Sequence, residues 1–329
     1  IGSCKNLPWR PFASALGLFL WQGFTYLPLP AYLAWNTVTN LGAITNLSVG
    51  ALTLHWLRQR NPHGRPWLSP ENVADCPFST LRTVTLTFVK LFVLTPLICI
   101  YLFTSMQLVV SHMSNGFLTV NLKGLFTECR TYEKNGRQVL LLPTVHIAAP
   151  SFYDEIMQTF PAEQAVILPE GVTDNQGLLK AKLDYSGVAD AVGLSAQPSL
   201  TAKRKDPSVR RYDADLGDFS KETIEILNVI ARVIESATTN DPMTAFEALS
   251  GLKEPDTEAL ITDILETRNA RLISGVEKEL ANFHYVAVPW GAAHMPGIER
   301  GLLKMQMRKV SQKQFNVFLW NDLNVFKSL

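Results

Sequence analysis

Long uncharged runs occupy the first third of the chain. Residues 11–57 contain no Lys, Arg, Asp or Glu. At about 1.5 Å per helical residue, this run is too long for one crossing of a ~30 Å hydrocarbon core. Prolines and turn-forming residues interrupt it. The pattern predicts a helix near 11–34 and a second near 39–57, which either spans a membrane or lies at its surface.

A third uncharged run extends from Leu91 to Val110 and is rich in Leu, Phe, Ile and Val. Continuous apolar runs in the core helices of soluble domains seldom exceed ~14 residues, so this run predicts a transmembrane helix. We therefore expect residues 1–111 to form a membrane region with two or three transmembrane helices. The lipid bilayer is the first expected partner.

The distribution of charged residues predicts on which side of the membrane each part of the chain lies. Residues 1–111 carry seven basic and two acidic residues, and basic loops stay on the matrix or cytoplasmic side. With three spans, residues 112–329 lie opposite the basic segment 58–82; if 39–57 does not span, they lie on the same side. The chain begins at Ile1, which fits a removed leader. We expect a mitochondrial inner-membrane protein with its large domain in the intermembrane space.

After residue 115, short apolar runs alternate with longer amphipathic stretches. This pattern predicts an α/β domain over residues 112–329, with a mixed sheet flanked by helices. The predicted strands are 116–122, 125–133, 136–143, 165–170, 283–290 and 315–321. The predicted helices are 151–160, 221–236, 255–283 and 295–310. The Asn135-Gly136 dipeptide predicts a hairpin between the second and third strands.

Composition excludes several classes of function. Residues 112–329 hold 23 basic and 27 acidic residues, which argues against a nucleic-acid partner. The four cysteines form no C-x-x-C pair, which argues against a zinc knuckle. The sequence also contains no P-loop and no Rossmann glycine fingerprint.

Three ionisable side chains follow three of the predicted strands. His146 follows the third strand, Glu170 the fourth and His294 the fifth. The carboxyl ends of parallel strands meet at one edge of a sheet, so these side chains converge if the strands are parallel neighbours. Two imidazoles and a carboxylate suit a divalent metal such as zinc. Without a metal, Glu170 could act as a general base with a histidine as its partner.

The motifs that surround these residues resemble those of the TraB/PrgY/Tiki-like superfamily over roughly residues 115–320. The matching elements are His146, Glu170, Arg268-Asn269, Gly291-Ala-Ala-His294 and Pro296-Gly297-Ile298. Members that resemble Tiki are membrane-anchored, metal-dependent peptidases. The resemblance implies that His146, Glu170 and His294 are catalytic and bind zinc, manganese or cobalt. It also implies that Arg268, Asn269 and Gly291 bind the substrate.

Two positions depart from the family pattern. Pro143 replaces the glycine of the first Gly-x-x-His element, and Asp174 stands where the family has an arginine. Proline removes a backbone donor, and aspartate reverses a charge. We therefore expect a weakly catalytic or non-catalytic accessory subunit of a mitochondrial membrane complex, with other membrane-protein subunits as partners. The alternative is an active metal-dependent peptidase that uses the His-Glu-His site.

Overall fold

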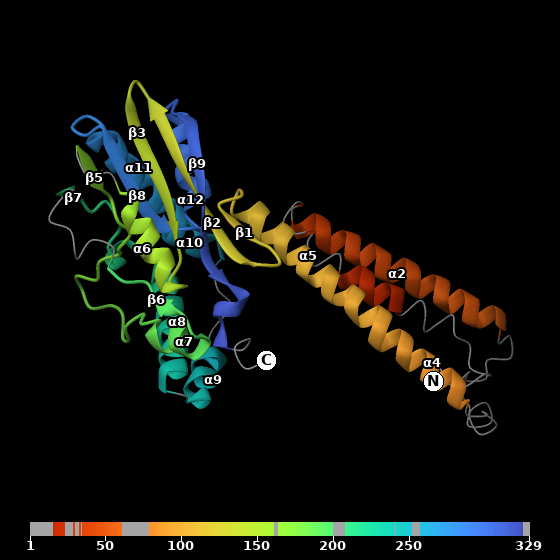
Figure 1. Ribbon diagram of the computed structural model, residues 1–329. Coiled ribbons are helices and arrows are strands. Elements are labelled where there is room, and N and C mark those ends of the chain that lie inside the picture. The colour runs from red at the N-terminus through yellow and green to blue at the C-terminus, as the bar shows by residue number, and fades with distance from the viewer. Residues whose placement is uncertain are drawn as a thin grey trace. The chain divides into compact units, whose positions relative to one another are not determined.

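The chain folds into two compact units, Ile1–Met113 and Ser114–Leu329 (Figure 1). The structure is a computed structural model. It describes residues 16–23, 29, 33, 35–60, 79–160, 164–199, 208–239, 241–251 and 257–324.

The first unit is helical. Residues 16–23 form a helix within the predicted range 11–34, and most of the rest of that range lies outside the described residues. Helix α2 (Trp35–Arg60) contains the predicted helix 39–57. The remaining helices are α4 (Thr80–Val89) and α5 (Thr95–Met113), which a π-helical segment (Lys90–Leu94) joins into one rod.

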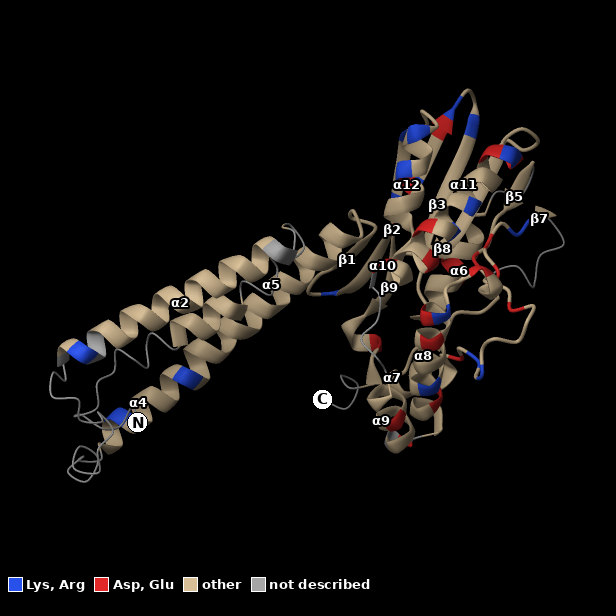
Figure 2. Cartoon of the chain, turned by 180° about the vertical axis from the view of Figure 1, so that it is seen from behind, with Lys and Arg blue, Asp and Glu red and all other residues tan. Residues whose placement is uncertain are grey.

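The rod from Thr80 to Met113 contains the predicted apolar helix 91–110. Its 34 residues are long and apolar enough to cross a membrane, and it is the one such helix in the described part of the chain. Large apolar side chains along it are exposed, including Leu81, at 78%, and Ile100, at 62%. Figure 2 shows that most of the rod is tan, the colour of residues other than Lys, Arg, Asp and Glu.

Pro96 explains why the rod contains a π-helical turn. Proline has no N–H, so the carbonyl of Phe92 has no α-helical donor at that position. The helix widens just before the proline, where both the N–H and the hydroxyl of Thr95 donate to the carbonyl of Lys90. Such a turn lets a helix continue past a proline instead of ending there.

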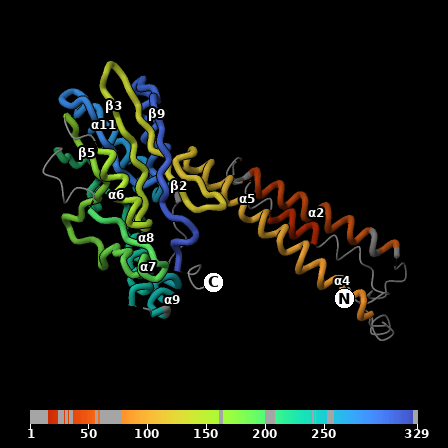
Figure 3. The backbone as a smooth tube through the Cα atoms, viewed as in Figure 1, coloured from red at the N-terminus to blue at the C-terminus, as the bar shows by residue number. Residues whose placement is uncertain are grey.

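The second unit is built on a seven-stranded sheet (Figure 3). Its strands are β1 (Leu118–Val120), β2 (Gly124–Lys134), β3 (Arg137–Thr144), β5 (Ala165–Ile167), β7 (Ser208–Val209), β8 (Tyr285–Gly291) and β9 (Arg308–Leu319). The order is β1-β2-β3-β8-β5-β7, with β9 beside β2. Strand β2 pairs antiparallel with β1, β3 and β9, whereas β3, β8, β5 and β7 run parallel. The predicted mixed sheet is confirmed.

Helix α6 (Pro150–Gln158) covers one face of this sheet, and α11 (Arg268–Glu279) and α12 (Met295–Lys304) cover the other. The unit also contains α7 (Ser186–Val192), α8 (Lys221–Thr239), α9 (Pro242–Ser250) and α10 (Thr257–Ile261). A π-helical segment (Thr262–Thr267) joins α10 to α11, and a short pair of strands, β4 (Ile147–Ala148) and β6 (Ser195–Ala196), lies outside the main sheet. One 3-10 turn (Leu216–Asp218) precedes α8, and another (Trp320–Asp322) follows β9.

Strand β8 shows how the core is divided between the two faces. Successive side chains of a strand point to opposite faces. Val286, Val288 and Trp290 accordingly pack in the cluster that contains α11 and α12, whereas Ala287 packs in the cluster that contains α6. The apolar run 283–290 is therefore a central strand that is buried on both sides.

Two of the predicted boundaries can be judged directly. The hairpin is confirmed: Lys134 pairs with Arg137, and Asn135 and Gly136 have φ of 53° and 75°, as a tight two-residue turn requires. The predicted helix 295–310 is wrong at its end. Helix α12 stops at Lys304 and β9 starts at Arg308, because pairing with β2 imposes a strand on a polar segment that lacks apolar alternation.

A buried polar network fixes α12 against β2. The carboxylate of Glu299, only 7% exposed, accepts hydrogen bonds from Arg130 Nη1 at 2.9 Å, from the hydroxyl of Tyr132 and from the amide of Asn115. Arg130 also donates to Glu128, at 2.7 Å, and to the carbonyl of Asn115, at 2.9 Å. Asn115 lies two residues after the end of α5 in the sequence.

We expect Glu299→Ala to lower the free energy of unfolding by about 3 kcal/mol, because it leaves Arg130 buried with one of its two carboxylate partners missing. The measurement is denaturant unfolding of the full chain in detergent, followed by circular dichroism. Glu277→Ala, at an exposed position on α11, is the matched control and should change stability by less than about 0.5 kcal/mol. Equal effects of the two substitutions would contradict this role of Glu299.

Candidate functional site

The three predicted site residues follow three neighbouring parallel strands. Strands β3, β8 and β5 lie side by side, and Thr144 at the end of β3 pairs with Gly291 at the end of β8. His146, Glu170 and His294 therefore leave the sheet at its carboxyl edge, where α/β proteins bind their ligands.

Arg268 lies at the centre of this edge. It is the first residue of α11 and is only 6% exposed. Its Nε and Nη2 donate to the two oxygens of Asp213, both at 2.8 Å, and Nη2 also donates to Glu170 Oε1 at 2.7 Å. Nη1 contacts His294 Nε2 at 3.1 Å and the carbonyl of Ile264 at 3.5 Å. When the His294 ring is neutral, all five guanidinium N–H groups therefore have partners within the protein.

His294 is 4% exposed, and both of its ring nitrogens have partners. Nδ1 lies 2.9 Å from Asn269 Oδ1, and Nε2 lies between two groups of opposite character. In the neutral ring, Nε2 accepts a hydrogen bond from Arg268; in the protonated ring, Nε2 faces Glu170 Oε1 at 3.4 Å. The ring also packs edge-on against Trp290, at 5.0 Å between centroids. The imidazole therefore has a polar partner at each nitrogen and an aromatic neighbour.

Two glycines of the family-like motif permit these close contacts. The N–H of Gly291 donates to Glu170 Oε2 at 2.6 Å, and a β-carbon at Gly291 would lie 3.1 Å from the same oxygen. A β-carbon at Gly297 would lie 2.3 Å from Asn269 Nδ2. Helices α11 and α12 can therefore approach closely enough for Asn269 to hold His294.

Glu170 lies between this buried cluster and the solvent, with its side chain 19% exposed. Burial acts to raise the pKa of its carboxyl group. The hydrogen bond with His294, the positive charge of Arg268 and the N–H of Gly291 outweigh burial and lower the pKa to about 2. Glu170 is therefore ionised and weakly basic at neutral pH.

Asp213 is the member of the cluster that the sequence did not reveal. Its side chain is 2% exposed and also accepts hydrogen bonds from the N–H groups of Gly171, at 2.8 Å, and Ala214, at 2.7 Å. It follows β7, a fourth parallel strand beside β5. That strand has only two residues, so no apolar run marks it in the sequence.

His146 occupies a different place from His294. It is exposed, and its ring stacks on Tyr185 with 4.5 Å between centroids and 5° between planes. His146 and Glu170 line one cavity of about 570 Å³. The structure therefore brings Glu170, His294, Arg268, Asn269 and Gly291 into one bonded cluster, with His146 on the wall of the adjoining cavity.

The contacting atoms of the cluster do not fit a resident divalent ion. A zinc-type site needs lone pairs that converge at about 2.1 Å from the metal. Here Arg268 contacts both Glu170 Oε1 and His294 Nε2 and supplies the local positive charge itself. Within the part of the chain that the structure describes, no three His, Cys, Asp or Glu side chains gather in a way that would hold a metal.

Comparisons of the chain with models of protein families, with curated proteins and with solved structures find no match. The resemblance to the TraB/PrgY/Tiki-like superfamily therefore depends on the sequence motifs alone.

We expect acid to destabilise the protein partly through Glu170. The pKa of this group is about 2 in the fold and near 4.5 when unfolded. Its contribution is therefore complete above pH 4.5 and is lost as the pH falls towards 2. The loss should reach about 2 kcal/mol at pH 3.

The measurement is the pH dependence of unfolding of the full chain and of Glu170→Gln. The variant should lack this part of the acid-induced loss. Glu225→Gln, at an exposed position on α8, is the control and should follow the unsubstituted protein. Parallel pH profiles for Glu170→Gln and the unsubstituted protein would show that Glu170 has no such role.

Proposed function

We propose that this protein is a membrane-anchored accessory subunit that uses a TraB/Tiki-like domain as a weakly catalytic or non-catalytic scaffold. The observation that carries the proposal is that the five N–H donors of Arg268 are all bound within the protein. A guanidinium group that stabilises a reacting oxyanion needs at least one donor directed at the substrate.

The acid–base groups support the same conclusion. A general base works best when its pKa lies near the working pH, whereas the pKa of Glu170 is about 2. His294 is buried, with both nitrogens engaged. Hydrolysis at this cluster would first require the ion pair between Arg268 and Glu170 to break.

The membrane part of the proposal is supported by the rod Thr80–Met113, most of whose apolar side chains are exposed or half-buried among the described residues. Burial of these side chains in a bilayer removes their contact with water. The charge distribution supports an orientation with the large domain opposite the basic segment 58–82. In the mitochondrial inner membrane, the setting that we propose, this places the large domain in the intermembrane space.

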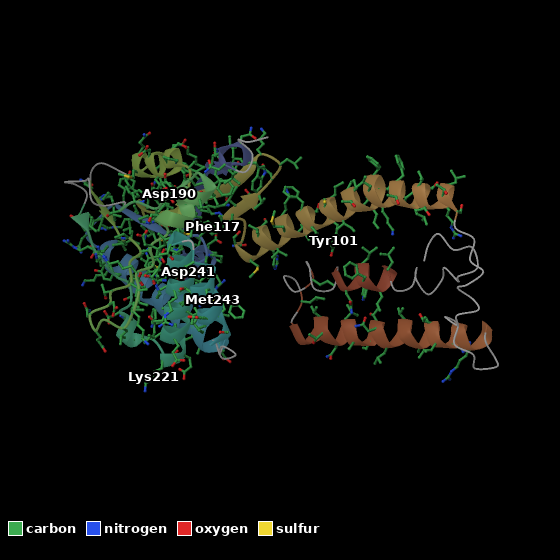
Figure 4. The ribbon with its side chains drawn as sticks, turned by 90° about the horizontal axis from the view of Figure 1, so that it is seen from below. Tyr101, Phe117, Asp190, Lys221, Asp241 and Met243 are labelled. Carbon is green, nitrogen blue, oxygen red and sulfur yellow. The ribbon has the colours of Figure 1, made fainter. Side chains whose placement is uncertain are left out.

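An exposed apolar stripe on α9 supports a protein partner. Met243, Phe246 and Leu249 are 61%, 68% and 55% exposed and lie three residues apart, on one side of the helix. Figure 4 labels Met243 beside Asp241, and Glu247 is also exposed. Exposed apolar patches with polar rims mark interaction sites. The acidic rim favours a partner subunit with basic residues around an apolar groove over anionic lipid headgroups.

The outer edge of β9 offers a second contact surface. No described strand pairs with β9 on the side away from β2, and residues 308–314 are exposed. A strand edge of this kind is a template for an added strand from another protein.

The alternative function is an active metal-dependent peptidase. The contact between Glu170 and His294, and the position of His146 on the cavity beside Glu170, favour it. A substrate would then have to displace Arg268 from Glu170 before a metal could bind, because the guanidinium already contacts the same oxygen.

We expect the purified full chain to show no peptide hydrolysis above background with Zn²⁺, Mn²⁺ or Co²⁺. The measurement is cleavage of a fluorogenic peptide library, with His294→Ala alongside. His146→Ala, at an exposed position, serves as a second control in case the buried substitution unfolds the domain. Turnover that either substitution abolishes would establish the peptidase instead.

We expect a protease added to one side of sealed mitochondria or vesicles to cut either segment 58–82 or domain 112–329, because three spans place them on opposite sides. Detergent should expose both segments. Cleavage of both from the same side without detergent would exclude the three-span topology.

A further inference from the structure

The cavity beside Glu170 has two chemically distinct parts. One part is apolar: Leu179, Leu216, Phe219 and Leu227 line it and belong to one hydrophobic cluster. The other part is polar and is lined by His146, Glu170 and Tyr185. A cavity of about 570 Å³ is within the range that holds a small organic ligand. Its two parts fit a ligand with a polar head and an apolar chain.

The charged side chains on the cavity wall indicate which charge the polar head group of the ligand carries. Three carboxylates line the cavity, those of Glu170, Asp174 and Asp184. Arg268 is the one cation among the described lining residues, and its donors have partners within the protein, Glu170 among them. The described wall thus carries three carboxylates and one guanidinium, and this excess of negative charge favours a cationic head over an anionic or a neutral one.

The aromatic side chains on the cavity wall also favour a cationic head group. The rings of His146 and Tyr185 stack nearly parallel, at 4.5 Å, on the wall that also contains Glu170. The negative face of a phenol ring attracts ammonium groups, and a neighbouring carboxylate strengthens the attraction. Aromatic rings beside a carboxylate are a common way to bind an alkyl ammonium group.

We propose that this cavity binds an alkyl-ammonium ligand. The ammonium group donates to Glu170 beside the stacked rings of Tyr185 and His146, and the chain lies along Leu179, Leu216, Phe219 and Leu227. The ligand is a small amphiphile with a single chain, because apolar side chains line the chain-binding part. Binding does not depend on whether the domain assembles with other subunits, and it requires no reaction.

The test is ligand binding to the full chain held in amphipol, measured by calorimetry and by the shift in unfolding temperature. The probes are octylamine, octanoate and octanol at equal concentration. Octylamine should bind with a Kd on the order of 0.1–1 mM, and the other two should bind at least about tenfold more weakly. Shortening the amine should weaken binding about threefold for each methylene removed.

Variants test the two halves of the site. Glu170→Gln should weaken octylamine binding at least about tenfold, because it removes the charged acceptor. Tyr185→Leu leaves the Arg268 cluster intact and should weaken binding about threefold or more, so it serves as the test if Glu170→Gln unfolds. Asp190→Asn, on α7 outside the cavity lining, should bind octylamine normally.

Two results would overturn the proposal. One is octanoate or octanol binding as tightly as octylamine. The other is octylamine binding that survives both Tyr185→Leu and Glu170→Gln. The acetylated tripeptide Leu-Lys-Leu amide presents the same ammonium on a peptide. If this peptide binds more tightly than octylamine, the cavity binds a peptide side chain and not a small amphiphile.

Discussion

The paired burial of two carboxylates against one guanidinium determines the arrangement of the whole carboxyl edge of the sheet. Glu170 and Asp213 come from loops after neighbouring strands, and without Arg268 their negative charges would repel each other in a poorly hydrated space. Burial of an ion costs several kcal/mol unless it is paired and hydrogen-bonded. The start of α11 is therefore fixed at the sheet edge, and α11 in turn positions Asn269 against His294. The same ion pairs fix Glu170 and Arg268, which form part of the cavity wall.

The residues of the family-like motif also have structural roles in the cluster around Arg268. Arg268, Asn269, Gly291, His294 and Gly297 each have a packing or hydrogen-bonding role within the fold. Loss of one member of a buried ion pair costs about 3–5 kcal/mol, which is a large part of the stability of a domain. Such residues are needed for folding whether or not the protein catalyses a reaction. The resemblance to metal-dependent peptidases is therefore compatible with a domain that only binds.

The sequence predicted the strands that form apolar runs. The central strands β3, β8 and β5, the hairpin at Asn135-Gly136 and the position of Glu170 at a strand end all follow from local pattern. Asp213 was missed because β7 is too short to leave a pattern. The start of β9 was missed because pairing, not side-chain alternation, makes residues 308–314 a strand.

The local sequence could not show that Arg268 is buried. Arg271 lies one turn later on the same helix and is exposed. Arg271 forms an ion pair with Asp218 at 2.9 Å, whereas Arg268 is buried. Burial depends on the distant carboxylates of Glu170 and Asp213, which no local window contains.

The network around Glu299 has a mechanical consequence. Any tension on α5 enters the second unit through the chain at Ser114, and the next residue, Asn115, is bonded to Arg130 on β2 and to Glu299 on α12. A load would therefore be shared between a central strand and a helix rather than peel one strand from the edge of the sheet. The amino end of the second unit is therefore anchored to two elements of its core.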